Sequence, residues 1–196
     1  IIGPRPARNH WSVFFQRGIA YERLKQWEKA EPNFNKALEL NPDQPQVLNY
    51  LGYSWVDMNR NLQQGLEMIK KAVELRPDDG YIVDSLGWAY FLTGRTDDAV
   101  DLLEKAQRGE PTNAVIVEHL GDAYWQAGRK FEARYKWRAA ALVAEAEMAT
   151  RLAAKLRASS LTSAACGRSA RAMPGCCSRP CTTGDSGAVT STMTSS

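Results

Sequence analysis

The chain has 196 residues, of which 44% are hydrophobic and 24% charged, and its formal net charge is +3. This composition is ordinary for a folded domain. Residues 1–158 alone are close to neutral, which argues against the basic surface that nucleic-acid binding needs. No run of about 18 apolar residues is present, so no membrane span is expected.

The chain begins at Ile1 rather than at Met, which suggests a fragment or a processed product. A signal peptide or lipid anchor would then lie upstream, so the cytoplasm and the cell envelope both stay open as compartments. Residues 1–10 are rich in Pro and Arg and have no periodic apolar face. We expect them to be a lead-in to the folded region.

Residues 11–144 repeat the same residue types with a period of 34 or 35 residues. Each period holds a glycine, an aromatic residue three positions later, a second small residue and an alanine, and the first three periods close with a proline. A fixed period of this length indicates a solenoid of stacked units, because one unit cannot bury its apolar face alone. The glycines are Gly18, Gly52, Gly87 and Gly121, and the second small residues are Ala30, Gly65, Ala99 and Ala133.

Each unit is predicted to contain two helices joined by a short turn. In the third unit, apolar residues recur three and four positions apart over residues 80–93, and a second such pattern covers residues 97–108. Thr96 is predicted to cap the second helix, and Pro111 prevents its continuation. The small residues would let the paired helices approach to about 8–10 Å.

The first two units show further departures from the common pattern. The second unit is one residue longer, and the extra residue falls in the predicted turn at residues 58–61, where an insertion costs little. In the first unit, Arg17 stands where the other units have Leu, which predicts a more exposed end. Pro32 lies within the second helix of that unit and is expected to delay or kink it.

These residues resemble the tetratricopeptide repeat (TPR), a 34-residue pattern of Leu-Gly, an aromatic residue, small residues and a closing Pro. The match covers about residues 11–144, and the third unit shows it as Leu86, Gly87, Tyr90 and Ala99. The sequence as a whole is similar to those of multi-repeat TPR proteins common in bacteria. The resemblance implies an all-α fold, a right-handed α-solenoid of about four TPR helix pairs, at about residues 11–44, 45–79, 80–113 and 114–147.

The resemblance also implies a concave groove that holds a peptide segment of a partner protein. The first helix of each unit lines such a groove with the face opposite to its repeated residues. In the second to fourth units, the predicted groove residues are Asn49, Tyr50, Tyr53, Asp57, Asp84, Trp88, Phe91, Glu118, Asp122 and Trp125.

The predicted groove is aromatic and acidic, and none of its residues is Lys or Arg. It would repel a terminal carboxylate and favour a basic or amide-rich peptide, because aromatic rings offer contact area and cation–π attraction to Arg and Lys. The alternative, that these rings only pack against neighbouring helices, stays open at this point.

No catalytic, cofactor-binding or metal-binding motif is present. His119 could be drawn as a triad with Asp122 and Ser85, but no nucleophile elbow accompanies them, so we interpret His119 as a surface residue of a helix. The segment at residues 78–80 resembles part of a calcium loop without its remaining ligands. We therefore expect no enzyme activity, no cofactor and no bound metal.

Residues 145–158 are predicted to form a capping helix, with Met148, Leu152 and Leu156 four positions apart. No Pro or Gly separates this helix from the preceding one, so the two could be continuous. Residues 159–196 are rich in Ser and Thr, contain all four Cys and lack aromatic residues. We expect a disordered tail there, and the abrupt change in composition also fits out-of-frame translation.

Two hypotheses for function follow. The first is a protein–protein interaction scaffold that binds a peptide segment of a partner in the TPR groove. The second is the repeat or regulatory portion of a larger enzyme, such as a TPR-bearing transferase, whose catalytic domain lies outside this chain.

Overall fold

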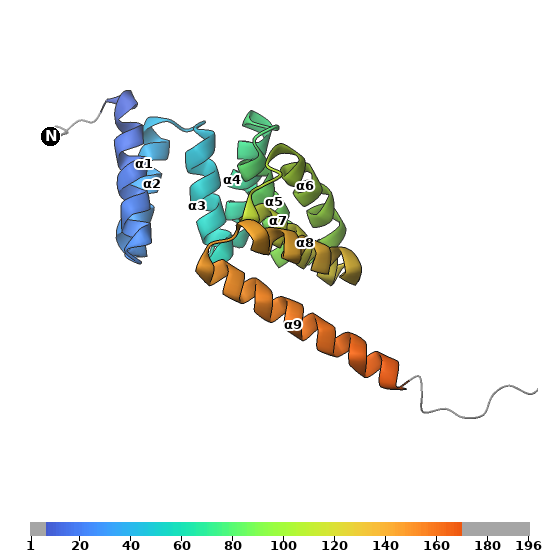
Figure 1. Cartoon of the computed structure of the whole chain (residues 1–196). Coiled ribbons are helices and arrows are strands. Elements are labelled where there is room, and N and C mark those ends of the chain that lie inside the picture. Colours follow the sequence, from blue (N-terminus) through green and yellow to red (C-terminus); the bar gives the residue numbers. More distant parts are fainter. Residues whose placement is uncertain (1–6, 170–196) are drawn as a thin grey trace, which may run out of the picture. The chain divides into compact units, whose positions relative to one another are not determined.

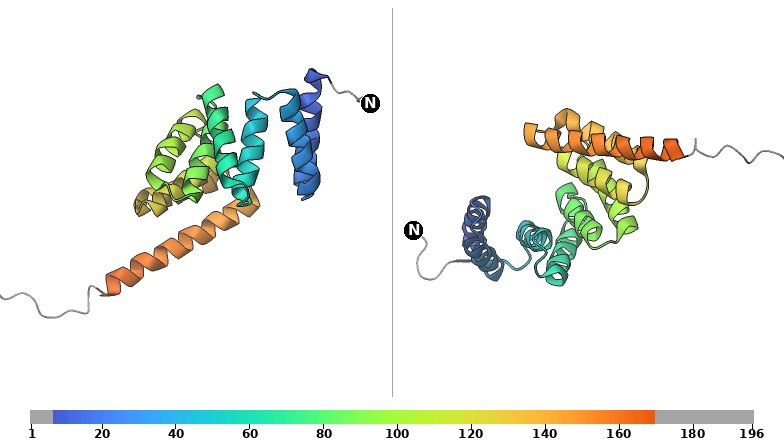
Figure 2. Two further views of the ribbon diagram at one scale, coloured as in Figure 1. Left: turned by 180° about the vertical axis from the view of Figure 1, so that it is seen from behind. Right: turned by 90° about the horizontal axis from the view of Figure 1, so that it is seen from below.

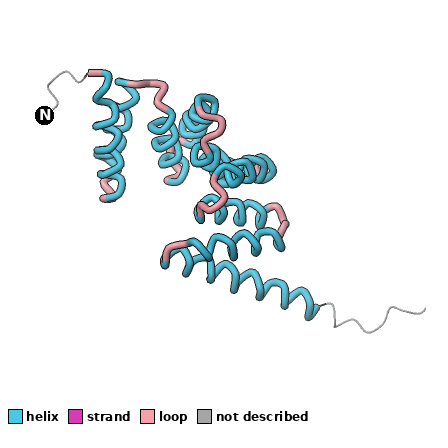
Figure 3. The backbone as a smooth tube through the Cα atoms, turned by 45° about the horizontal axis from the view of Figure 1, so that its top comes forward, coloured by secondary structure: helices cyan, strands magenta, loops and turns pink. Residues whose placement is uncertain are grey.

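The structure is a computed structural model that describes residues 7–169, and these residues form helices and no strands (Figures 1 and 3). A single 3₁₀ turn, η1 (Arg8–His10), precedes the first α-helix. Four helix pairs and a final helix follow: α1 (Trp11–Arg23) with α2 (Trp27–Leu40), α3 (Pro45–Asp57) with α4 (Leu62–Leu75), α5 (Gly80–Leu92) with α6 (Thr96–Gly109), α7 (Ala114–Gln126) with α8 (Lys130–Val143), and α9 (Ala146–Ser169).

The predicted fold class is confirmed, because the described residues form an α-solenoid of TPR helix pairs. Internal contacts divide the chain into residues 1–159 and residues 160–196. Within residues 7–159, the helix pairs follow one another in chain order (Figure 2).

The repeated small residues lie where the two helices of each pair touch. A Cβ atom added to Gly52 would stand 2.7 Å from the carbonyl oxygen of Gly65, and one added to Gly65 would stand 2.8 Å from that of Gly52. In the fourth pair, a Cβ on Gly121 would meet the indole of Trp137 at 2.5 Å. The sequence period therefore marks the closest helix contacts, and a larger side chain there would force the helices apart.

The helix ends follow local sequence signals. Asp79 and Asn113 accept hydrogen bonds from the first backbone amides of α5 and α7, and Pro45 occupies the first turn of α3, where its missing N–H costs nothing. The extra residue of the second unit lies in the turn before α4, where Asn59 and Asn61 take positive φ angles. The predicted cap at Thr96 is wrong, because Thr96 is the first residue of α6 and Arg95 occupies the N-cap position.

The first pair is the least buried. Gly18 is the one buried residue of α1, and Arg17 is exposed, as its departure from the common pattern predicts. Pro32 does not delay α2, because this helix begins five residues earlier, at Trp27. In the later pairs both helices contribute buried side chains, and the largest cluster joins α6, α7, α8 and α9.

The last two helices are not continuous. Ala144 takes an extended backbone conformation, with φ −76° and ψ 145°, and separates α8 from α9. Leu152 of α9 is fully buried against α7 and α8, which is the contact expected of a cap. The helix continues to Ser169, beyond the predicted end at residue 158. The rest of the predicted tail, residues 170–196, lies outside the described residues, and so do its cysteines Cys176, Cys177 and Cys181.

Candidate peptide-binding site

One repeat position, three residues before the repeated glycine, places a polar side chain on the first helix of three consecutive pairs. It holds Asn49 in α3, Asp84 in α5 and Glu118 in α7. Asp84 is 7% exposed and Glu118 is 3% exposed, which is unusual for carboxylates and requires partners for their charge. We call the surface that carries the ten predicted groove residues the inner face.

The inner face is open at its N-terminal end, where a cavity of about 340 Å³ lies against α1, α3, α5 and α7. Aromatic, acidic and amide side chains line it together. Five predicted groove residues are among them: Asn49, Tyr50, Tyr53, Asp57 and Asp84. The remaining lining residues are Glu22, Trp27, Ser54, Met58, Tyr81, Ser85, Val115 and His119.

Asn49 lines this cavity and has an unsatisfied acceptor. Its side-chain oxygen Oδ1 is buried, and no residue that the structure describes donates a hydrogen bond to it. A buried polar atom without a partner costs about 1–3 kcal/mol. A ligand N–H that reached this oxygen, after the Asn49 side chain turned toward the cavity, would remove this cost.

Two tyrosines form the aromatic wall of the cavity. The hydroxyl of Tyr50 donates to Oε2 of Glu22 at 3.1 Å, and the ring packs edge-on against Phe15. Burial, together with the negative charge of Glu22, raises the pKa of Tyr50 to about 12. Burial and the nearby Asp57 and Asp84 raise the pKa of Tyr53 to about 12. Both side chains are therefore neutral over the physiological range, and the carboxylates supply the negative potential.

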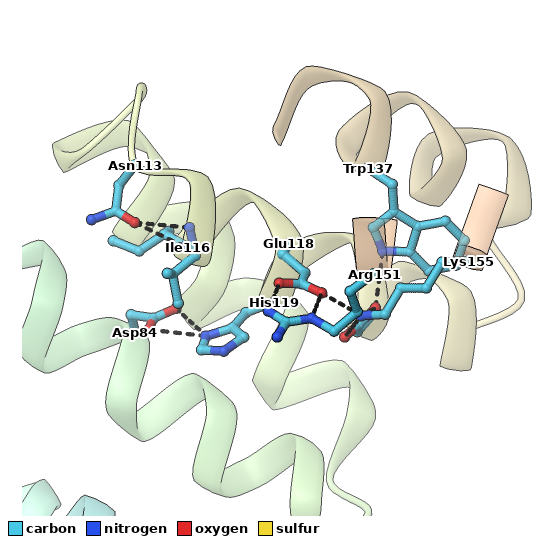
Figure 4. A network of polar contacts seen from close by, with 10 residues as sticks. Asp84, Asn113, Ile116, Glu118, His119, Trp137, Arg151 and Lys155 are labelled. Atoms are coloured by element: carbon cyan, nitrogen blue, oxygen red, sulfur yellow. Dashed lines mark hydrogen bonds and ion pairs between the residues drawn. The ribbon is translucent and has the colours of Figure 1, made fainter. Parts of the chain in front are cut away.

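Asp84 is already paired within the protein (Figure 4). His119 of α7 places Nδ1 3.0 Å from both carboxylate oxygens of Asp84. The imidazole stacks on Trp88, with ring centroids 4.0 Å apart, and Trp88 stacks on Phe91 at 4.7 Å. The expectation that His119 is a surface residue is therefore wrong, because it is 8% exposed and joins α5 to α7.

The triad drawn from the sequence does not assemble. Ser85 donates its hydroxyl to the carbonyl of Tyr81 at 3.0 Å, and His119 bonds to Asp84 rather than to Asp122. Among the described residues, no hydrogen bond joins Ser85 to His119.

At the C-terminal end of the inner face, helix α9 supplies cations that the sequence analysis did not place there (Figure 4). Arg151 donates from Nε and Nη2 to the two carboxylate oxygens of Glu118, at 3.0 and 2.6 Å. Lys155 bonds to Glu118 at 2.7 Å and to both oxygens of Asp122 at 2.7 and 2.6 Å. Asp122 also accepts from Nε1 of Trp137 at 2.9 Å.

These contacts decide the ionisation of Glu118. Burial alone would raise its pKa, but the hydrogen bonds and charges of Arg151 and Lys155 outweigh burial and hold the pKa below the ordinary value of 4.5. Trp125 packs on Trp137, with ring centroids 5.3 Å apart. Nζ of Lys130 lies 4.9 Å from the ring centroid of Trp125. The C-terminal carboxylates of the inner face are thus neutralised within the chain.

The ten predicted residues therefore do not form one continuous site. Five line the cavity, while Trp88 stacks on both His119 and Phe91, and Glu118 and Asp122 bind α9. The repeat frame could have found Glu22, because it occupies in the first unit the position of Phe91 and Trp125. Arg151 and Lys155 lie four apart in the sequence, but their target depends on how α9 packs, which no local pattern reveals.

A tetratricopeptide-repeat family model matches residues 11–44, and a second model of the same description matches residues 58–114 and 85–149. The chain belongs to the tetratricopeptide-repeat family. No curated protein matches the sequence.

Several solved structures share the fold, among them structures of MamA. A MamA double mutant of RS-1 is 21% identical, with a TM-score of 0.58 over 69% of this chain and 75% of that one. MamA of AMB-1 is 25% identical, with a TM-score of 0.56 over 66% of this chain and 76% of that one. A further MamA structure is 21% identical, with a TM-score of 0.56 over 68% of this chain and 72% of that one.

The family and the fold support the general function of a protein-interaction scaffold. Within residues 7–169, no helix combines the length and apolar character needed to cross a membrane. In the same part of the chain, no three His, Cys, Asp or Glu side chains whose positions are described converge as metal ligands would.

Proposed function

We propose that the chain binds a peptide segment of a partner protein in the cavity between α1, α3 and α5, and that the segment carries basic or amide side chains. The observation that carries this proposal is the buried, unpartnered oxygen of Asn49 beside an open cavity of about 340 Å³. Such a cavity accommodates one or two side chains and the backbone between them rather than a whole helix.

The charges of the cavity favour a cationic or amide anchor. Asp84 is hydrogen-bonded to His119, but Asp57 has no ion pair to any residue the structure describes, and Glu22 is engaged there only by the neutral hydroxyl of Tyr50. A Lys or Arg side chain between Tyr50 and Tyr53 would meet these two carboxylates. The tyrosine rings would cover its apolar stem and add a cation–π attraction of about 0.5–2 kcal/mol.

The equivalent residues of the later repeats provide a precedent within the chain. Asp84 takes its partner from α7, and Glu118 takes its partners from α9, so each buried polar residue is satisfied by the next helix along the inner face. Asn49 is not satisfied in this way by α5. A partner's side chain would complete the same series in trans. It would do so whether the chain acts alone or as the repeat portion of a larger enzyme.

A peptide array followed by anisotropy titration of the best peptides tests the proposal with the full chain. We expect the selected peptides to contain Lys, Arg, Asn or Gln, and their affinity to fall as salt rises, because partly exposed charges are screened. Asp57→Lys should weaken their binding at least tenfold. Asp101→Lys, the same charge change on exposed α6, is the matched control and should leave binding unchanged.

Two results would overturn the proposal. Selected peptides rich in Asp and Glu would contradict the charge of the cavity. Equal effects of Asp57→Lys and Asp101→Lys would show that binding takes place elsewhere on the protein.

A further inference from the structure

The second helix of the last pair, α8, exposes large apolar side chains along one stripe. Phe131 is 76% exposed, Tyr135 is 64% exposed and Leu142 is 87% exposed. With Arg138 they are spaced four, three and four residues apart, so they lie on one side of α8. The buried residues Ala133, Trp137 and Ala140 occupy the opposite side. We call Phe131, Tyr135, Arg138 and Leu142 the α8 stripe.

The other repeats show what these positions hold when only water covers them. Counted from the second small residue of each unit, the position of Phe131 is Glu28, Gln63 and Asp97 in the first three pairs. In the same order, the position of Tyr135 is Pro32, Glu67 and Asp101, and that of Leu142 is Glu39, Glu74 and Arg108. The fold therefore does not need apolar side chains at these positions, and an exposed apolar stripe on one repeat alone marks an interaction surface.

The charges beside the stripe indicate the partner. Arg138 lies within the stripe and Arg134 one turn along its edge, and neither has an ion pair to any residue the structure describes. Lys130 reaches the ring of Trp125, and no carboxylate in the described part of the chain pairs with it. Unpaired Arg side chains next to aromatic and aliphatic anchors suit a helix with apolar residues on one face and Glu or Asp along its edges.

We propose that the α8 stripe docks an acidic amphipathic helix of a partner protein. This surface is separate from the cavity near Asn49, so the proposal does not depend on the proposed function. Phe131, Tyr135 and Leu142 would enter the apolar face of the partner helix, and Arg134 and Arg138 would bind carboxylates at its edge.

A single helix fits this surface better than an anionic membrane does. Helix α6 lies beside α8, since Nζ of Lys136 bonds to Oε1 of Gln107 at 2.6 Å and Arg129 reaches Glu104 at 3.4 Å. Helix α6 exposes Asp97 and Asp101 at the stripe positions. A flat anionic surface broad enough to cover α8 would approach these carboxylates, whereas one helix, about 10 Å wide, can follow α8 alone.

The test uses the full chain and two fluorescent synthetic helices with the same leucine and phenylalanine face. One carries Glu along its edges and the other carries Lys at the same positions. We expect anisotropy to show binding of the Glu helix and at least tenfold weaker binding of the Lys helix. The double variant Phe131→Asp/Tyr135→Asp introduces the residues that the third repeat has at these positions. It should weaken binding of the Glu helix at least tenfold and keep the wild-type helix content.

Further variants distinguish charge from apolar contact and this surface from the cavity. Arg138→Glu should weaken the Glu helix and strengthen the Lys helix. Asn49→Leu, in the cavity, should change neither. Equal binding of both helices, or unchanged binding by the double variant, would overturn the proposal. So would wild-type dimers that the double variant abolishes, or stripe-dependent binding to vesicles of anionic lipid, since these results would assign the stripe to a second copy or to a membrane.

Discussion

Asn49 and Glu118 occupy the same position of the repeat in α3 and α7, but their surroundings differ completely. The oxygen of Asn49 is buried without a donor beside an open cavity. Glu118 receives Arg151 and Lys155 from α9, is 3% exposed and does not line that cavity. The difference arises from the next helix in the stack, since α9 presents two cations to Glu118, whereas α5 presents no donor to Asn49.

This difference shows that the acidity of a repeat surface does not by itself measure what the surface can bind. Asp84, Glu118 and Asp122 look like three free carboxylates in the sequence, but each is bonded to a side chain from a later helix. The charge available to a partner is therefore concentrated at Glu22 and Asp57, in the open part of the inner face. The closed part of the inner face, where Glu118 and Asp122 bind α9, contributes to stability rather than to recognition.

The largest expected effect is at the closed end, where Leu152→Ala should lower the free energy of unfolding by about 2–5 kcal/mol. Leu152 is fully buried among Leu120, Trp137 and other residues of the largest cluster, so truncation leaves a cavity that this rigid contact cannot fill. Thermal and urea unfolding monitored by circular dichroism measure the change. Leu142→Ala is the matched control, because Leu142 is 87% exposed, and it should change stability by less than about 0.5 kcal/mol. Equal losses would mean that α9 does not cap the stack.

The next effect separates the charges of α9 from its apolar contact. Lys155→Met keeps the length of the side chain but removes the bonds to Glu118 and Asp122. Hydrogen bonds to charged groups contribute about 1.5–3 kcal/mol, so we expect a loss in that range. Lys36→Met is the control, since it breaks an exposed pair with Glu39 that contributes about 0–1 kcal/mol. If both variants lost equally little, the closed end would be held by apolar packing alone.

The helix pairs could be predicted because one period repeats four times, and each small residue of that period marks a helix contact. Gly52 and Gly65 show this, since each would clash with the other's backbone if it carried a side chain. The inner face was harder to predict, because the repeat position of Glu118 shows that the residue faces inward but not what meets it. The contacts of Arg151 and Lys155 depend on the break at Ala144, which follows no Pro or Gly signal. The prediction that His119 lies on the surface is wrong for the same reason, since its partner Asp84 lies one repeat away.

The pH dependence of the free energy of unfolding should report the ion pairs of Glu118 at the closed part of the inner face. Its pKa in the folded protein is lowered, because hydrogen bonds and charges from Arg151 and Lys155 outweigh the opposing effect of burial. The ionised form therefore stabilises the fold fully above the ordinary pKa of 4.5, and this contribution is lost as the pH falls through the folded pKa. The stability advantage of the wild type over Glu118→Gln should be constant near neutral pH and shrink in acid. An advantage that grew on acidification would contradict the ion pairs.

The smallest effect on stability is expected at the open end. Asn49→Leu replaces a buried acceptor that has no donor with an apolar side chain of similar size. Because no hydrogen bond is lost and an unsatisfied polar atom is removed, the free energy of unfolding should stay within about 0.5 kcal/mol of the wild type or rise slightly. Peptide binding should nevertheless weaken at least tenfold, because the ligand loses its acceptor.

This separation of stability from binding is the sharpest test of the comparison between the two ends. Ser54→Ala, which removes a hydroxyl that donates to the backbone carbonyl of Tyr50, provides a control at the same cavity. It should leave peptide affinity within about twofold, since this hydroxyl is already bonded within its own helix. If Asn49→Leu instead destabilised the protein as Lys155→Met does, Asn49 would have a partner inside the fold. The polar groups at the cavity near Asn49 would then be satisfied within the protein, as those around Glu118 are. Peptide recognition would have to be sought elsewhere on the inner face.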